Sequence, residues 1–198
     1  LLDATGDVSV ANTASVFTNA LTIQSDNRVA LTVDLSTSAG NLSIDGDADN
    51  AADTNDNVDI AGGLTLTTAG LLTLDATTNG IAGVALTLNA AEGVTINDAL
   101  TTTGTLTVNA DTDANDNSGT FTTVGAVSAG NNAIAITAND VALTGTLSSG
   151  TNTTTLNDSD GTGAGLGNTA VSNGLNVSGT ELQNVTATGF EIATGGNI

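Results

Sequence analysis

The chain has 198 residues, of which 21 are acidic and only one, Arg28, is basic, so its formal net charge is −20. A chain without a basic patch cannot release counterions from phosphates, which excludes nucleic acids and anionic membranes as partners. Cys, His and Lys are absent, so thiolate or imidazole metal sites, Ser–His or Cys–His nucleophile pairs and lysine Schiff bases cannot be built.

The elements predicted along the chain are short strands rather than helices. No apolar run approaches the roughly 18 residues of a transmembrane helix, and no segment keeps the i, i+3, i+4 apolar stripe of a surface helix. Apolar-x-apolar triplets recur instead, with the period of two that is typical of a strand with one buried face. A first set of triplets is "LTI" at 21, "LSI" at 42, "LTL" at 64, "LTL" at 86, "LTV" at 106, "VSA" at 127 and "LSS" at 147. A second set includes "LTV" at 31, "LTL" at 72, "VTI" at 94 and "AIAI" at 133.

The first set recurs at a nearly constant step along the sequence. This spacing predicts an all-β fold, a right-handed parallel β-helix (β-solenoid) with roughly 20–22 residues per coil, in which coils pair about 4.8 Å apart. In this register the inward residues stack on one another and the outward residues form hydroxyl ladders. The residues expected inward are Ile23, Ile44, Leu66, Leu88 and Val108, and those expected outward include Ser43, Thr65 and Thr87.

The competing fold is an antiparallel sandwich, whose strands recur about every 8 to 12 residues. Sandwich cores usually contain aromatic side chains, whereas this chain has three phenylalanines and no Trp or Tyr. Residues 1–198 are therefore expected to be a single β-solenoid segment. Both ends stay in strand-and-turn phase without the polar cap that a solitary solenoid needs. We expect a longer repeat array or filament, with other copies or flanking repeats as end-to-end partners.

Three stretches rich in Asp and Asn interrupt the strand pattern, at residues 45–59, 109–119 and 157–167. In the register above, each follows a strand of the first set, so all three are expected to protrude from one edge of the solenoid. Repeat folds tolerate such insertions because they lengthen loops on one face. The simplest interpretation is a hydrated spacer that keeps an aliphatic rod soluble.

The first acidic stretch also has the spacing of a calcium loop. Its aspartates match positions 1, 3, 5, 9 and 12 of the EF-hand loop, whose ligands are oxygen atoms. Asn50 replaces the turn glycine, and an aspartate replaces the final glutamate. The alternative to the spacer is therefore a calcium site, and no other cofactor is expected. Its predicted ligands are Asp45, Asp47, Asp49, Asp53 and Asp56.

Paired carboxylates on a β-helix could also cleave polysaccharides. Such sites typically add cations that stabilise charge, and Arg28 is the single cation here. No catalytic residue is therefore predicted, and the chain is expected not to be an enzyme. Arg28 is expected to be a surface counter-charge to Asp26 or Asp34.

Hydroxyl ladders on a flat face are also typical of ice-binding proteins, which need two ranks of Thr at constant spacing. Thr65 and Thr67 supply both ranks locally. Asp45 and Asn89 are expected to interrupt the second rank, which disfavours ice binding.

Near the end of the chain, residues 174–192 read "GLNVSGTELQNVTATGFEI". This stretch resembles a repeat of filamentous-haemagglutinin-like bacterial surface and secreted proteins, in which a strand is followed by an "ELxxV" segment, a "TxG" turn and an "F/LxI" strand. The resemblance implies a secreted, right-handed parallel β-helix in a large adhesin or surface fibre, and it supplies no catalytic residues. The matching residues are Leu175, Val177, Glu181, Leu182, Val185, Gly189, Phe190 and Ile192.

Together these features predict a non-enzymatic structural segment of an extracellular, cell-surface bacterial filament or adhesin, a stiff acidic rod that stacks end to end. The alternative left open is a calcium-dependent carbohydrate- or surface-binding module, with surface glycans as partners. A more remote alternative is a polysaccharide-active β-helix enzyme. An inert rod is expected to be indifferent to a chelator, whereas a calcium-dependent module should lose binding.

Overall fold

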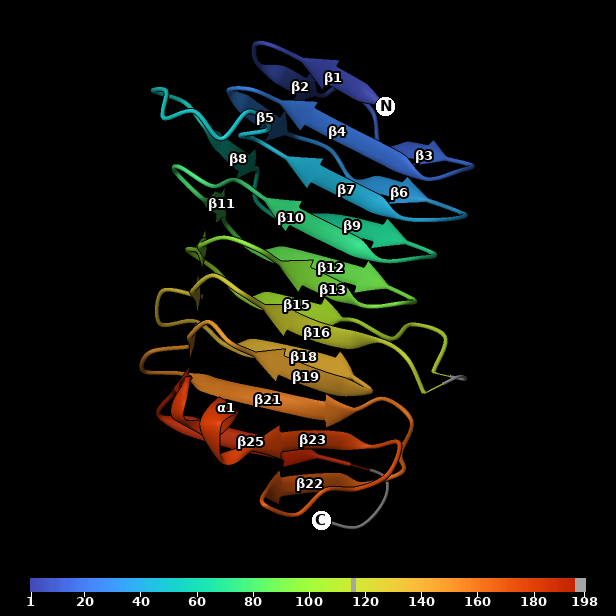
Figure 1. The fold of residues 1–198 in the computed structure, drawn as a ribbon, viewed down its shortest axis with the longest axis vertical. Coiled ribbons are helices and arrows are strands. Elements are labelled where there is room, and N and C mark those ends of the chain that lie inside the picture. The colour runs from blue at the N-terminus through green and yellow to red at the C-terminus, as the bar shows by residue number, and fades with distance from the viewer. Residues whose placement is uncertain (115–116, 195–198) are drawn as a thin grey trace.

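The computed structural model describes residues 1–114 and 117–194, which form a parallel β-helix of stacked coils (Figure 1). Each of the first seven coils contributes one strand to each of three sheets, and the strands pair in parallel with those of the neighbouring coils. The predicted fold class is therefore confirmed.

The three long sheets each collect strands from successive coils. Sheet A comprises β1 (Leu2–Ala4), β4 (Leu21–Ser25), β7 (Leu42–Asp45), β10 (Leu72–Asp75), β13 (Val94–Ile96), β16 (Thr120–Thr123) and β19 (Asp140–Leu143). Sheet B comprises β2 (Val8–Val10), β5 (Arg28–Leu31), β8 (Asn57–Ile60), β11 (Ile81–Gly83), β14 (Leu100–Thr102), β17 (Val127–Ser128), β20 (Leu147–Ser148) and β24 (Val185–Thr186). Sheet C comprises β3 (Ser15–Phe17), β6 (Leu35–Thr37), β9 (Leu64–Thr68), β12 (Leu86–Ala90), β15 (Leu106–Asn109), β18 (Ile134–Ala138), β21 (Thr153–Asp158) and β25 (Gly189–Ala193).

A small lobe interrupts the winding after β21. It contains a two-stranded parallel sheet of β22 (Ala164–Gly167) and β23 (Leu175–Ser178), followed by the short helix α1 (Gly179–Gln183). Ser178 and Glu181 form a capping box at the start of α1, which satisfies backbone donors that the helix leaves free. The Glu181 Oε1 also accepts a hydrogen bond from the Leu143 N–H at 3.2 Å. The lobe is thereby attached to the edge of sheet A.

The alternation of the triplets decides which side chains fill the interior. All five residues predicted to point inward have exposed fractions of 0–1%, and the hydroxyl residues between them lie on the outer faces, where most are half-buried. The predicted inward and outward positions are therefore confirmed. The physical reason is that neighbouring residues of a strand point to opposite faces of the sheet.

The predicted stacking of the first set in one column is wrong. Ile23 pairs with Ile44 in sheet A, whereas Leu66 pairs with Leu88 in sheet C. The triplets at 127 and 147 lie in sheet B, where Val127 is opposite Leu147. The first set therefore passes through all three sheets, and its hydroxyl residues form three short ladders.

Insertions explain why the triplets of the first set move from one sheet to another. Leu42 is the register partner of Leu21 on one side and of Leu72 on the other. The coil that runs from Leu42 to Leu72 is the longer of the two, because the first acidic stretch lies within it, between β7 and β8. The next coil, from Leu72 to its partner Val94, has no such insertion and returns to the predicted length. Triplets that are spaced at a constant step along the sequence therefore fall in a different sheet wherever a long coil lies between them.

The acidic stretches do not share one edge, contrary to the prediction. The first connects β7 of sheet A to β8 of sheet B, at the left of Figure 1. The second follows β15 and the third follows β21, both at the ends of sheet C strands, at the right of Figure 1. The third also follows β21 rather than the triplet at 147. The two corners are therefore separate candidate sites.

Candidate functional site

The first candidate site is the acidic loop, defined as residues 46–56 between β7 and β8. The loop packs against the turns of both neighbouring coils. The Ala48 N–H donates to the Ser25 carbonyl at 2.9 Å, and the Asn79 N–H donates to the Asp56 carbonyl at 3.0 Å. Backbone contacts therefore hold the loop against the body of the solenoid.

Two aspartates of the acidic loop are fully buried. Asp47 is 1% exposed and Asp56 is 0% exposed. The Asp47 Oδ2 accepts hydrogen bonds from the Thr78 N–H at 2.8 Å and from the Thr78 hydroxyl at 2.6 Å. The Asp56 Oδ2 accepts from the Asp53 N–H. The Oδ1 atom of each is buried and has no hydrogen-bond partner among the described residues.

The other three predicted calcium ligands lie elsewhere. The Asp45 Oδ1 accepts from the Asp47 N–H, and the Asp49 Oδ1 accepts from the Ala51 N–H, both at 3.0 Å. Asp49 and Asp53 are both exposed. The structure thus brings Asp47 and Asp56 to the base of the loop and leaves the others at its margin. No group of three or more acidic residues, within residues 1–114 and 117–194, is arranged as a metal site. The five-ligand calcium site stays a prediction.

A row of carboxyl groups borders the acidic loop where the sheet A strands end: Asp45 ends β7, Asp75 ends β10, and Asp98 follows β13. Asp45 is the register partner of Asp75, whose Oδ2 accepts from the Asn97 amide at 2.8 Å. Burial and a hydrogen bond to Asp75 raise the pKa of Asp98 to about 6. Burial also raises the pKa of Asp45, and the carboxylates of Asp75 and Asp47 raise it further. Negative charge is therefore concentrated along this row.

Sequence reasoning missed the row because its members come from three coils. A signal was present, since "LSID" at 42 and "LTLD" at 72 both end in aspartate directly after a strand triplet. Parallel, in-register pairing of these triplets places the two carboxyl groups side by side.

The second and third acidic stretches meet at the other corner, so these two do share one edge, as predicted. Asp111 is 2% exposed, and its Oδ2 accepts from the Ser159 hydroxyl at 2.5 Å. The Asn139 amide donates to the Asp160 Oδ2 at 2.7 Å. Burial raises the pKa of Asp111, and the carboxyl groups of Asp113 and Asp160 act in the same direction. Ser159 and Asn139 supply neutral donors to these carboxylates.

Sheet C presents the opposite surface character. The outward side chains of β9, β12, β15, β18 and β21 carry no charge, although the chain carries −20. Asp45 lies on sheet A, so it does not interrupt this face as predicted, whereas Asn89 does lie in its second rank. We call it the uncharged face. Its two ranks are Thr65, Thr87, Thr107, Ala135 and Thr155, and Thr67, Asn89, Asn109, Thr137 and Asn157.

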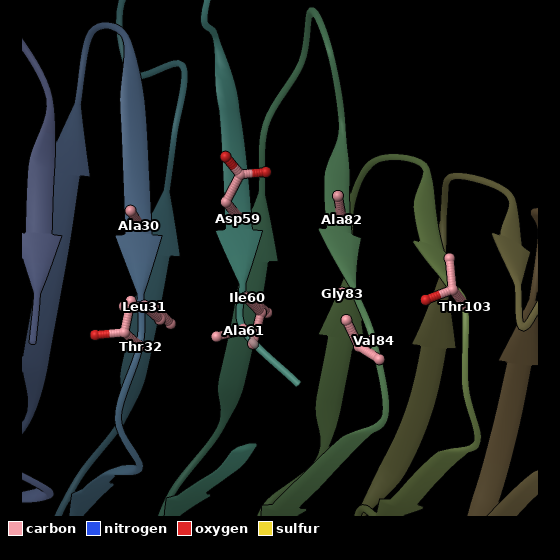
Figure 2. A pocket seen from close by; sticks show the side chains of 10 residues that line it. All are labelled: Ala30, Leu31, Thr32, Asp59, Ile60, Ala61, Ala82, Gly83, Val84 and Thr103. Carbon is pink, nitrogen blue, oxygen red and sulfur yellow. The ribbon is translucent and has the colours of Figure 1, made fainter. Parts of the chain in front are cut away.

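A shallow groove of about 350 Å³ crosses the outside of sheet B (Figure 2). Small side chains such as Ala30 and Ala82 line it, and Asp59 stands between them on the middle strand. Asp59 accepts from the Asn57 amide at 3.0 Å and lies 3.8 Å from the Arg28 guanidinium. The groove therefore offers a mainly apolar floor with one carboxylate that already has partners.

Arg28 forms its closer ion pair with Asp7 at 2.9 Å. The predicted pairing of Arg28 with Asp26 or Asp34 is therefore wrong. In parallel strands the nearest charges come from the adjacent coils, as Asp7 and Asp59 do here, rather than from sequence neighbours.

Two carboxylates also line a pocket of about 250 Å³ between the small lobe and sheet A. The Asp140 Oδ1 accepts from the N–H groups of Val141 and Asn176, both at 2.9 Å. Both oxygens of Glu181 likewise accept from backbone N–H groups. These bonds fasten the lobe, so the pair has a structural use that needs no substrate.

Comparisons of the chain with family models, with curated proteins and with solved structures give no significant match. The resemblance to filamentous-haemagglutinin-like proteins stays a prediction. Among the residues that the structure describes, no helix has the length and apolar character needed to span a membrane. Function is therefore argued from the geometry.

Proposed function

We propose that this chain is a non-enzymatic structural segment of an extracellular bacterial filament or adhesin, a stiff acidic rod whose coils continue end to end. One observation supports the proposal most directly: core-facing positions of the end coils are uncovered. Leu2 is 45% exposed, although its register partner Ile23 is 0% exposed. Phe17 on β3 and Phe190 on β25, at opposite ends of sheet C, are 37% and 38% exposed.

The edges of the end coils support the same proposal. Within the described part of the chain, strands β1, β2 and β3 each pair on one side only, as does β25 at the other end of sheet C. An unpaired parallel edge next to exposed core residues is the surface that a further coil would cover, either of the same chain or of another copy. A contact between unlike ends propagates into a fibre rather than closing a dimer.

The net charge of the chain affects how strongly the ends of two rods associate. With a net charge of −20, two rods repel each other at low ionic strength, and added salt screens the repulsion. The same repulsion keeps rods from associating side by side. We therefore expect end-to-end association to strengthen as salt increases.

Sedimentation and electron microscopy of the 198-residue chain across a salt series test the proposal. We expect linear assemblies that lengthen with salt and that are lost in Phe17→Asp. The matched control is Val84→Asp, because Val84 is exposed on the side of the rod. Circular dichroism checks that both variants keep their strands. Monomers at every salt concentration, or equal loss in both variants, would refute end-to-end association.

A second candidate function is binding to a neutral, hydroxyl-bearing surface such as a crystalline polysaccharide. The observation that favours it is the uncharged face, whose hydroxyl and amide groups can donate and accept hydrogen bonds without charge repulsion. Calcium could contribute by ordering the acidic loop, as in the predicted calcium-dependent module.

Pull-down on microcrystalline cellulose and chitin, with and without chelator, tests this candidate. We expect Thr87→Asp and Thr107→Asp to abolish binding and Thr95→Asp, on sheet A, to leave it intact. Binding that none of these variants changes would exclude the uncharged face as the binding surface. Binding to ice but to neither polysaccharide would make ice, rather than a polysaccharide, the ligand of this face.

A further inference from the structure

Two buried carboxylates, Asp47 and Asp56, lie at the base of the acidic loop. The backbone at Gly46 approaches that at Asn57 so closely that a Cβ on Gly46 would lie 2.2 Å from the Asn57 carbonyl oxygen. The loop therefore leaves and re-enters the solenoid at adjoining positions. Asp47 follows Gly46 and Asp56 precedes Asn57, so both lie where the loop begins and ends. Both residues are essentially inaccessible to solvent.

Each carboxylate is only half satisfied by the protein. Thr78 occupies the Asp47 Oδ2, and the Asp53 N–H occupies the Asp56 Oδ2. Both Oδ1 atoms are buried and have no partner among the described residues. A buried ionised oxygen without a donor or counter-charge is strongly unfavourable, and buried charges in proteins are normally paired or bound to metal.

The chain itself cannot provide the counter-charge. Its single base, Arg28, already pairs with Asp7 and Asp59 on the outside of sheet B. The neighbouring carboxyl groups of Asp45 and Asp75 add further negative charge. A counter-charge for the base of the loop would therefore have to come from solution.

We propose that a calcium ion binds at the base of the acidic loop, with the Oδ1 atoms of Asp47 and Asp56 as its protein carboxylate ligands. Hard divalent cations prefer oxygen ligands, and calcium accepts carboxylates, backbone carbonyls and water in irregular geometry. Asp45 and Asp49 are left out of the proposed ligand set, because neither is fully buried and neither has a buried oxygen without a partner; the Oδ1 atom of each accepts a backbone N–H of a local turn.

This site differs from the five-aspartate EF-hand pattern and has a structural role. Asp47 contacts the turn of the next coil through Thr78, so a bound ion fixes the acidic loop against that coil. The proposal stands independently of end-to-end assembly, which does not require the loop.

Calcium titration by calorimetry, on the intact chain stripped with chelator, tests the site. We expect one binding event that weakens roughly tenfold or more in Asp47→Asn and in Asp56→Asn. The matched controls are Asp49→Asn and Asp53→Asn, which remove the same charge from the margin of the same loop. They should weaken binding only through long-range charge, by about threefold or less.

Hydrogen exchange on the unmodified chain keeps the test decisive if a variant fails to fold. Calcium should slow exchange of amides in residues 46–56 and leave those of the second acidic stretch unchanged. Slower exchange only in the second stretch, no binding heat, or equal losses in the buried and marginal variants would overturn the proposal.

Discussion

Sheets A and C share one interior and differ on the outside. Both bury columns of Leu and Ile with exposed fractions near zero, such as Leu74 in sheet A and Leu66 in sheet C. Outside, the carboxyl row of Asp45, Asp75 and Asp98 lies at the ends of the sheet A strands, whereas the outer face of sheet C is uncharged from β9 to β21. Inward positions thus determine the fold, and outward positions are left to determine charge and binding.

The largest expected effect comes from placing one carboxylate at an inward position instead of the adjacent outward position. Leu66→Asp buries an unpaired carboxylate and should lower the free energy of unfolding by roughly 4 kcal/mol or more. Thr65→Asp, at the adjacent outward position of β9, should lower it by less than about 1 kcal/mol. Urea unfolding followed by circular dichroism measures both changes. Equal losses would contradict the assignment of inward and outward faces.

A smaller effect is expected from pH, and it should arise on sheet A. The pKa of Asp98 is raised to about 6 from its ordinary value of 3.8, so the folded state binds a proton that the unfolded state has already released. The stability that this proton contributes should therefore be fully present below about pH 4 and should be lost as the pH rises through about 6. Because Asp98 is partly solvated, the difference should not exceed about 1 kcal/mol.

The measurement is the unfolding free energy between about pH 4 and pH 7, in high salt to screen the overall charge. Asp98→Asn should be more stable than the parent at neutral pH and should lose most of this dependence. A variant that keeps the full slope would show that the dependence arises elsewhere.

The smallest effect is expected on the uncharged face. Thr87→Ala and Thr107→Ala remove outward hydroxyl groups that have no role in the core. Each should change the free energy of unfolding by no more than about 0.5 kcal/mol. The urea midpoint checks this, and a larger loss would mean that the hydroxyl ladder itself stabilises sheet C.

The sequence by itself determined where most strands lie and which of their side chains face inward. The triplet "LTV" at 31 is a wrong prediction, since β5 ends at Leu31 and Val33 lies in the bend before β6 and is not buried. Alternation with a period of two is a local property, so Ile23, Ile44 and Leu66 could be assigned to the interior from their own triplets. The composition likewise determined that counter-charges are scarce, since Arg28 is the single base. These conclusions needed no knowledge of which coil lies beside which.

Only the tertiary structure decided which strands are neighbours. Loop closure becomes less favourable only slowly as a loop lengthens. The long coil from Leu42 to Leu72 therefore closes in the same register as the shorter coil from Leu21 to Leu42. For this reason, spacing along the sequence cannot reveal where the register shifts between sheets.

The same limit applies to the acidic loop. Asp47 and Asp49 are the same residue type two positions apart, yet Asp47 is buried and Asp49 stays accessible to solvent. The difference arises from Thr78, which lies far along the chain and donates to Asp47 from the next coil. This contact between coils buries Asp47 and so makes it part of the candidate site. The local sequence could not show this, because the burial of Asp47 depends on a residue of the next coil.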